Sequence, residues 1–396
     1  MLDEVGFIWS NRYTEFNLGK SHPMNPRRLL VPYELFNCLG ILKASNIQLF
    51  TPSPASDSEI QLFHTHKYLD AMKELSEEEG GYQLNLGLGS GDCPVFPEMH
   101  ESSRLVVGGA LEGAKRIQNG DVKQAFSLLG GLHHAFKDRA AGFCYYNDAA
   151  IAIRYLQKEY GLERILYIDT DVHAGDGVLN AFYNEDTVLG ISFHESPQFI
   201  FPGTGFSNEI GDGAGTGYSI NLPLYPGTWD DLYIRLFEQI VPCIWETYDP
   251  EFVIWQCGAD GHFRDILGHL TLTTETYHYL GRRIAELTNK SKAKGKLLLL
   301  GGGGYNPDSV ARVWLASFAG VTGFKIPEES PIGWVDYCQK EFGIKTSLQL
   351  KDEPIDPKRI EQHILIEEAN NKYLQVLKEE IRETSVWKNC ESFQQE

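Results

Sequence analysis

The chain has 396 residues, 42% of them hydrophobic and 22% charged, which is the ordinary balance of a globular protein with a large core. A formal net charge of −19 repels phosphate backbones, so direct binding to nucleic acid is not expected. The same charge would favour cationic partners such as lysine-rich peptides or polyamines, although an acidic surface also keeps a protein soluble. No apolar run reaches the ~18 residues of a membrane span, and the acidic N-terminal segment is unlike a signal peptide. A cytoplasmic protein without membrane contact is therefore expected.

The seven cysteines are scattered along the chain and include no CxxC pair. An odd, unclustered set fits a reducing compartment better than a disulfide framework. All seven are therefore expected to be reduced.

Apolar runs rich in β-branched residues alternate with helical segments along the chain. In chain order, the expected strands are Val5–Trp9, Gln124–Leu129, Arg164–Asp171, Val188–His194, Phe252–Cys257 and Lys296–Leu300. The expected helices are Ser102–Gln118, Ala149–Glu159, Trp229–Glu246, Thr274–Thr288 and Pro307–Ala319. Near-continuous apolar strands that alternate with helices are typical of a parallel sheet covered on both faces.

These patterns predict an α/β fold with a mainly parallel central sheet flanked by helices, built as a single three-layer domain over residues 1–350. Residues 351–396 are more charged and helix-like. They are expected to form a C-terminal extension that packs on the domain or trails it.

Four polar or glycine-rich clusters each coincide with or follow the end of an expected strand. They are residues 130–134 (GGLHH), 169–173 (DTDVH), 258–260 (GAD) and 301–305 (GGGGY). In open parallel sheets, ligands bind beyond the carboxyl ends of the strands. The clusters are therefore expected to meet at one site.

Asp169, Asp171 and His173 share one face if the strand that precedes them persists that far. Asp171, His173 and Asp260 would supply three ligands to a divalent cation and leave one position open, as in catalytic zinc sites. Oxygen-rich ligands would also accept Fe²⁺ or Co²⁺. The alternative is that these residues are exposed on a loop.

His133 and His134 would act as the general acid and base on a water molecule and on the leaving amine. Asp169 and Asp176 are the carboxylates available to orient them, although Asp169 could instead bind a second cation. An adjacent histidine pair can also be incidental.

The run Gly301–Gly304 has two interpretations. A glycine-rich turn before a helix can cradle phosphate, but the run lacks the spacing of the known phosphate-binding motifs. The other interpretation is a tight turn that brings Tyr305 to the metal, where its phenol would stabilise an oxyanion. A packed aromatic residue would be the ordinary role of such a tyrosine.

Together these residues resemble zinc-dependent histone deacetylases of the arginase–deacetylase fold, and most closely the prokaryotic acetoin-utilisation (AcuC-like) deacetylases. The matching segments run in family order from about residue 20 to residue 320. They are residues 22–28 (HPMNPRR), 91–94 (GDCP), 130–134, 142–148 (GFCYYND), 169–178, 191–194 (ISFH), 201–205 (FPGTG), 258–260 and 301–306.

The resemblance implies removal of acyl groups from lysine side chains of proteins. It places zinc on Asp171, His173 and Asp260, the acid–base pair on His133 and His134 with Asp169 and Asp176 behind them, and the carbonyl-polarising group on Tyr305. The other implied residues are substrate contacts at Asp92, Gly142, Phe143, Phe201 and Leu267, potassium ligands at Asp169, Asp171, His173, Ser192 and Phe193, and Arg28 beside a channel for acetate. Acetyl-CoA synthetase is the protein substrate that the AcuC-like members suggest.

Three other functions compete with this one. Arginase-like enzymes use two manganese ions, and the sequence around Asp260 lacks the extra Asp-x-Asp that a second ion needs. An acetylpolyamine amidohydrolase would use the same chemistry with a different tunnel and rim. An inactive acyl-lysine-binding module would have lost a ligand, a histidine of the pair or Tyr305, and none is lost. The oligomeric state stays open.

Overall fold

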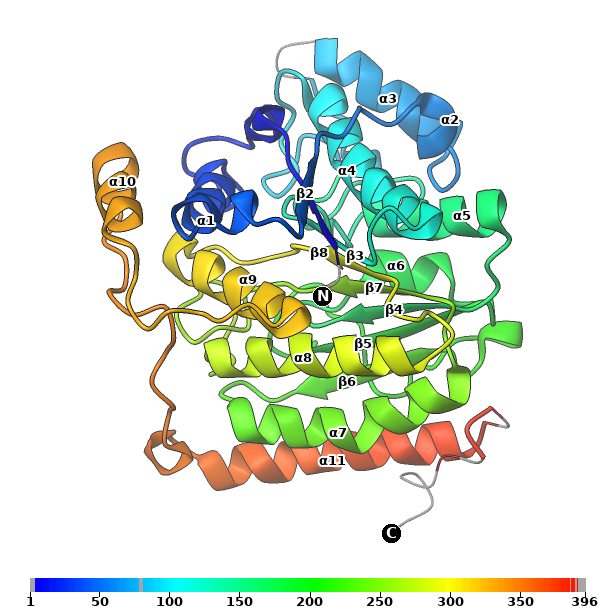
Figure 1. Cartoon of the computed structure of the whole chain (residues 1–396). Coiled ribbons are helices and arrows are strands. Elements are labelled where there is room, and N and C mark those ends of the chain that lie inside the picture. Colours follow the sequence, from blue (N-terminus) through cyan, green and yellow to red (C-terminus); the bar gives the residue numbers. More distant parts are fainter. Residues whose placement is uncertain (1–3, 78–80, 385, 389, 391–396) are drawn as a thin grey trace.

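A central sheet of eight parallel strands runs through the computed structural model, which describes all residues except 1–3, 78–80, 385, 389 and 391–396 (Figure 1). The strand order is β2-β1-β3-β8-β7-β4-β5-β6. The strands are β1 (Val5–Ile8), β2 (Ile47–Phe50), β3 (Gln124–Ser127), β4 (Ile165–Asp169), β5 (Val188–Glu195), β6 (Ser219–Leu224), β7 (Phe252–Gln256) and β8 (Leu297–Leu300).

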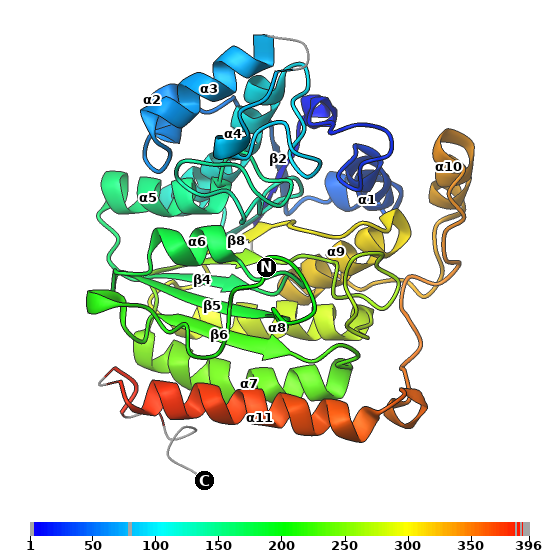
Figure 2. The ribbon, with the colours of Figure 1, turned by 180° about the vertical axis from the view of Figure 1, so that it is seen from behind.

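Helices cover both faces of the sheet, as Figures 1 and 2 show from opposite sides. The helices are α1 (Arg27–Cys38), α2 (Asp57–Ile60), α3 (His66–Glu77), α4 (Met99–Asn119), α5 (Asp148–Tyr160), α6 (Asp176–Ala181), α7 (Asp230–Tyr248), α8 (Thr274–Lys290), α9 (Pro307–Thr322), α10 (Ile332–Phe342) and α11 (His363–Arg382). The predicted α/β fold with a parallel sheet between helical layers is confirmed.

Two hydrophobic cores lie on the two faces of the sheet because successive strand side chains point to opposite sides. On β4, Ile165 and Tyr167 join the core under α4, α5 and α6, whereas Leu166 and Ile168 join the core under α1, α7, α8 and α9. Both sets are fully buried, which explains why the strand reads as a nearly continuous apolar run.

The strand predicted as Arg164–Asp171 ends two residues early, at Asp169. The Asp169 side chain accepts a hydrogen bond from Asp171 N (3.1 Å), and the Asp171 side chain accepts one from His173 N (3.0 Å). Such side-chain bonds to the backbone two residues on are typical of turns and compete with the strand ladder. Asp171 and His173 therefore lie on a loop and not on the face of a strand.

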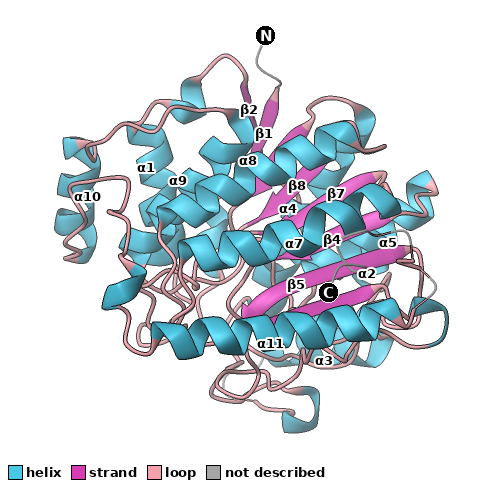
Figure 3. Ribbon diagram, turned by 90° about the horizontal axis from the view of Figure 1, so that it is seen from below, coloured by secondary structure: helices cyan, strands magenta, loops and turns pink. Residues whose placement is uncertain are grey.

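The C-terminal helix α11 packs along the edge strand β6 (Figure 3) and lies beside α7 (Figures 1 and 2). Its buried side chains include Leu374, Leu377 and Ile381. Beyond it, Cys390 forms a disulfide bond with Cys243 of α7, so the expectation that every cysteine is reduced is wrong for this pair. The division at residue 350 stays a prediction. The described helices include none with the length and apolar composition of a membrane-spanning segment.

Candidate active site

Loops from the middle of the sheet start side by side beyond its carboxyl edge. In the ladder, Ser127 of β3 pairs with Leu300 of β8, and Asp169 of β4 pairs with Gln256 of β7 and Ser192 of β5. The strands β3, β8, β7 and β4 therefore end at neighbouring positions of the ladder, and β5 continues to Glu195. This register brings together the four clusters that were predicted to form one site.

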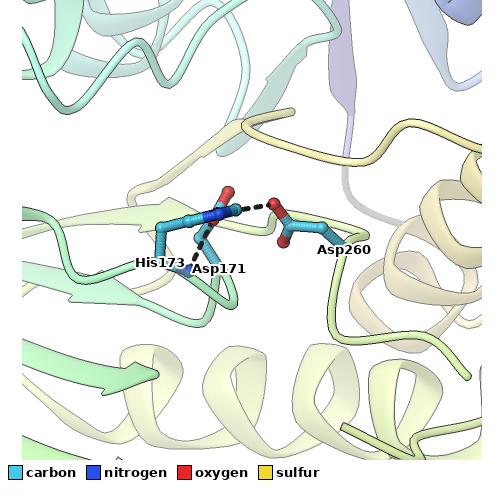
Figure 4. A group of neighbouring side chains, drawn as sticks. All are labelled: Asp171, His173 and Asp260. Atoms are coloured by element: carbon cyan, nitrogen blue, oxygen red, sulfur yellow. Dashed lines mark hydrogen bonds and ion pairs between the residues drawn. The ribbon is translucent and has the colours of Figure 1, made fainter. Parts of the chain in front are cut away.

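Asp171, His173 and Asp260 point toward one another from two different loops (Figure 4). His173 Nδ1 lies 3.2 Å from Asp171 Oδ1 and 3.1 Å from Asp260 Oδ2. One potential ligand atom from each residue lies within 4.8 Å of those of the other two, and all three residues are buried. The loops after β4 and β7 thus assemble the predicted ligand set.

The charges of this triad fit a bound divalent cation. Burial raises the pKa of Asp260, and the negative charge of Asp171 raises it further. Burial alone would lower the pKa of His173, but the two carboxylates raise it to about 10. A divalent cation would compensate both buried carboxylates, and one nitrogen with two oxygen donors suits zinc with a coordination position left open.

Hydrogen-bond donors hold the carboxylates of the triad in place. Asp171 Oδ2 accepts hydrogen bonds from Gln256 Nε2 (2.9 Å) and from Gly303 N (2.7 Å). A β-carbon on Gly303 would lie 2.1 Å from Asp260 Oδ2, so only glycine fits against the triad. Gln256 was not predicted as a site residue, although a polar residue at the end of an apolar strand is a visible signal in the sequence.

His133 and His134 lie in contact with each other and with one carboxylate each. The two Nε2 atoms are 3.0 Å apart. His133 Nδ1 lies 2.7 Å from Asp169 Oδ2, and His134 Nδ1 lies 2.7 Å from Asp176 Oδ1. The hydroxyl of Tyr167 also donates to Asp169 Oδ2 (2.6 Å). Each histidine therefore contacts one of the two carboxylates, Asp169 and Asp176, that were expected to orient the pair.

The environment shifts the pKa values of the two histidines in opposite directions. Burial alone would lower the pKa of His133, but the charges of Asp169 and Asp171 raise it to about 9. Burial and the positive charge of His133 lower the pKa of His134 to about 4, although Asp176 acts the other way. At neutral pH the pair therefore carries one positive charge: His133 is protonated and can donate a proton, and His134 is neutral and can accept one.

Tyr305 follows the glycine run after β8 and lines the same cavity as His173. Its ring packs edge-on against Phe143, with ring centroids 5.7 Å apart. Burial, and then the charges of Asp260 and Asp171, raise the pKa of the phenol well above its usual value of 10. The hydroxyl therefore stays protonated at neutral pH and can donate a hydrogen bond.

Arg28 is buried behind Tyr305, with its guanidinium carbon 5.8 Å from the tyrosine ring centroid. Arg28 Nε donates to Gly304 O (2.8 Å) and Nη2 donates to Gly302 O (2.6 Å). It forms no ion pair with any residue that the structure describes. The fixed positive charge fits the prediction of an acetate channel here, which the contacts do not test.

The five residues predicted to contact the substrate all line one cavity of about 240 Å³. Its lining residues are Asp92, His134, Gly142, Phe143, His173, Ile200, Phe201, Leu267 and Tyr305. A β-carbon on Gly142 would lie 2.5 Å from the His134 ring and 2.8 Å from the Phe201 ring, so only glycine fits between them. Phe143 is held at φ 69°, a strained conformation for a bulky residue that is typical of functional sites. Ile200 also lines the cavity and was not predicted from the sequence.

Residues 22–321 match the family model of the histone deacetylase domain. This chain belongs to the histone deacetylase family. It is 40% identical over 348 residues to the acetoin utilization protein AcuC of Bacillus subtilis (strain 168), a match that covers 85% of this chain and 88% of that protein. It is 37% identical over 317 residues to histone deacetylase RPD3 of Saccharomyces cerevisiae, covering 78% of this chain and 70% of that protein.

The structural comparison agrees with the sequence match. The crystal structure of a histone deacetylase homolog from Aquifex aeolicus matches with a TM-score of 0.81 and 30% identity, covering 93% of this chain and 99% of that chain. The predicted resemblance to histone deacetylases, and to their AcuC-like members, is confirmed. Membership of this family supports deacetylase activity, and the buried Asp-His-Asp triad fits the metal site that such chemistry uses.

The potassium ligands that the family resemblance implies lie at the end of β4, in the loop that follows it and within β5. Asp169 pairs with Ser192 in the ladder, and Phe193 follows on β5. Ser192 Oγ lies 2.8 Å from His194 Nδ1. Binding of potassium by Asp169, Asp171, His173, Ser192 and Phe193 stays a prediction.

Proposed function

We propose that this histone deacetylase family member is a zinc-dependent hydrolase that removes acetyl and related acyl groups from the ε-amine of lysine in proteins. The observation that carries the proposal is the cavity of about 240 Å³, which brings apolar walls together with His173, His134 and Tyr305. Apolar walls suit the methylenes and the uncharged amide of an acylated lysine, and they disfavour a free ammonium.

Zinc held by Asp171, His173 and Asp260 would polarise the acyl carbonyl and make a water molecule more acidic. The same donors would accept Fe²⁺ or Co²⁺. The nearby Asp169, Ser192 and Phe193 are the remaining candidates for a structural potassium ion.

The histidine pair moves the protons of the proposed hydrolysis. One imidazole takes a proton from the attacking water, and the pair returns a proton to the lysine nitrogen as the amide bond breaks. Asp169 and Asp176, each 2.7 Å from a ring nitrogen, fix the orientation of the imidazoles.

Tyr305 donates a hydrogen bond to the carbonyl oxygen as negative charge develops there. Phe143, Phe201 and Leu267 contact the lysine methylenes, and the exposed Asp92 accepts hydrogen bonds from the substrate backbone. Arg28, buried behind Tyr305, attracts the acetate product.

The net charge of −19 favours lysine-bearing partners at long range. The relationship to AcuC proteins makes an acetylated acetyl-CoA synthetase a candidate substrate. In this proposal residues 1–350 form the catalytic domain, and residues 351–396 form an extension that packs on it.

A turnover panel tests the proposal. Purified protein is loaded with zinc and offered acetyl-, propionyl-, butyryl- and lactyl-lysine peptides and acetylated polyamines, with and without a chelator. Turnover of the peptides that the chelator abolishes is the expected result. Faster turnover of acetylpolyamines would move the function to acetylpolyamine hydrolysis, and binding without turnover by the zinc-loaded protein would indicate an inactive acyl-lysine-binding module.

A further inference from the structure

One carboxylate in the loop after β7 joins two parts of the candidate active site. Asp265 Oδ2 accepts a hydrogen bond from Tyr305 N (2.7 Å). Asp265 Oδ1 accepts one from Leu267 N (2.9 Å) and a longer one from Gly268 N (3.5 Å). Tyr305 and Leu267 both line the cavity, and they come from the loops after β8 and β7.

Two contacts hold the peptide bond that precedes Tyr305: its N–H donates to Asp265 Oδ2, and its carbonyl, Gly304 O, accepts from Arg28 Nε. Among the residues described, none forms a hydrogen bond with the Tyr305 hydroxyl, whereas the Tyr305 backbone N–H is tied to Asp265. The neighbouring Asn306 adds a second tie between the same loops, because its Nδ2 donates to Arg264 O (3.1 Å). The hydroxyl is therefore aimed by the backbone from which the side chain starts.

Asp265 is itself anchored to the core of the protein. Its backbone N–H donates to His262 O (2.8 Å). The His262 ring is fully buried, and its Nε2 lies 2.9 Å from Asp352 Oδ2. Asp352 also pairs with the buried Arg312 of α9. These buried contacts through His262 and Asp352 therefore fix the position of Asp265, which in turn holds the two loops.

We propose that Asp265 is the positioning residue of the active site. Its one carboxylate fixes the direction of the Tyr305 hydroxyl and holds Leu267 in the wall of the cavity. The inference rests on the proposed deacylase function and extends it to a residue that touches neither substrate nor metal. Small misplacements of a catalytic group are costly, because a shift of ~1 Å lowers rates by about 100-fold.

The test uses the zinc-loaded full-length protein and the variant Asp265→Asn. An amide offers its oxygen to only one of the two backbone N–H groups and turns its own NH₂ toward the other. We expect kcat for an acetyl-lysine peptide to fall by about 10- to 100-fold. In the Tyr305→Phe background the same substitution should change kcat by less than about 3-fold, because the group that it aims is already absent.

A second readout reports on Leu267. In the slow Tyr305→Phe protein, the Kd of the acetyl-lysine peptide is measured by calorimetry, with and without Asp265→Asn. A rise of about 3- to 10-fold is expected, because the cavity wall loses its tether. Zinc content and the unfolding midpoint are measured for every variant.

Asp230→Asn is the matched control. Asp230 is also a carboxylate that accepts a backbone hydrogen bond from another segment, Thr273 N (2.9 Å), and it lines no part of the cavity. Its replacement should lower the unfolding midpoint and leave kcat and KM unchanged. A general loss of stability would affect the two variants alike, whereas loss of positioning affects only Asp265→Asn.

The outcomes separate the two proposals. A folded, zinc-loaded wild-type protein that turns over no acyl-lysine peptide would overturn the proposed function. An active wild type in which Asp265→Asn lowers kcat equally in both backgrounds, or not at all, would overturn the positioning role. If Asp265→Asn does not fold, Asp265→Glu, which keeps both acceptor oxygens but displaces them, is put through the same cycle and judged by the same criteria.

Discussion

Replacing Tyr305 with Phe removes one oxygen atom and leaves the ring contacts in place. The ring keeps its contact with Phe143 at 5.7 Å and with the Arg28 guanidinium at 5.8 Å. No described residue hydrogen-bonds the hydroxyl, so the free energy of unfolding should change by less than ~0.5 kcal/mol. The triad of Asp171, His173 and Asp260 is untouched, so zinc content should stay near that of the wild type.

The catalytic effect of Tyr305→Phe should be large. A single donor to a developing oxyanion contributes about 2.7–4 kcal/mol to the barrier, which corresponds to a 10²- to 10³-fold loss of kcat. Because the pKa of the phenol is raised well above 10, it stays protonated, and the loss should be the same at every pH from 6 to 9.

The assay is steady-state release of acetate from an acetyl-lysine peptide, with zinc content and the unfolding midpoint measured on the same samples. A kcat within about 3-fold of the wild type, in protein that is folded and zinc-loaded, would refute the assignment of Tyr305 as the group that polarises the carbonyl. A loss of zinc or of stability would show that the residue acts through the structure of the site.

Three further predictions concern other parts of the molecule. Gly303→Ala should lose most of its zinc, because its β-carbon would lie 2.1 Å from Asp260 Oδ2, whereas Gly333→Ala, with its nearest neighbour atom 3.7 Å away, should bind zinc normally in metal analysis. Phe201→Ala should raise KM for the acetyl-lysine peptide by about 10-fold, or ~1.4 kcal/mol, in steady-state kinetics; an unchanged KM would remove Phe201 from the substrate contacts. Burial lowers the pKa of His64 to about 3, whereas the unfolded chain binds the proton near pH 6.5, so the folded state loses stability as the pH falls from 6.5 toward 3. In chemical denaturation His64→Gln should reduce this slope by up to ~1.4 kcal/mol per pH unit, and equal slopes would contradict the reasoning.

The sequence predicted the six inner strands of the sheet and missed both edge strands. Inner strands are buried on both faces, so they read as apolar runs that stand out from their surroundings. The edge strand β2 (Ile47–Phe50) is short and partly exposed, and β6 (Ser219–Leu224) contains Pro223. Proline argues against a strand in general, but it is tolerated at an edge, where one side of the strand needs no ladder partner.

The sequence also predicted which side chains meet, because parallel strands deliver their following loops to one edge. It did not predict what holds them there. Gln256 and Asp265 support the site through hydrogen bonds to residues 85 and 40 positions away in the chain, Asp171 and Tyr305. Contacts of this range depend on the exact path of each loop, and residue spacing carries no information about that path.

The helix α11 has a consequence for the integrity of the whole protein. A bare outer strand offers unpaired N–H and C=O groups to any other chain that approaches it. Packed along β6, α11 shields that strand and buries Leu374, Leu377 and Ile381. A chain that ends before residue 363 would keep every residue that lines the catalytic cavity, but it would expose the outer edge of β6. Such a chain is expected to self-associate through that edge while the active site stays intact.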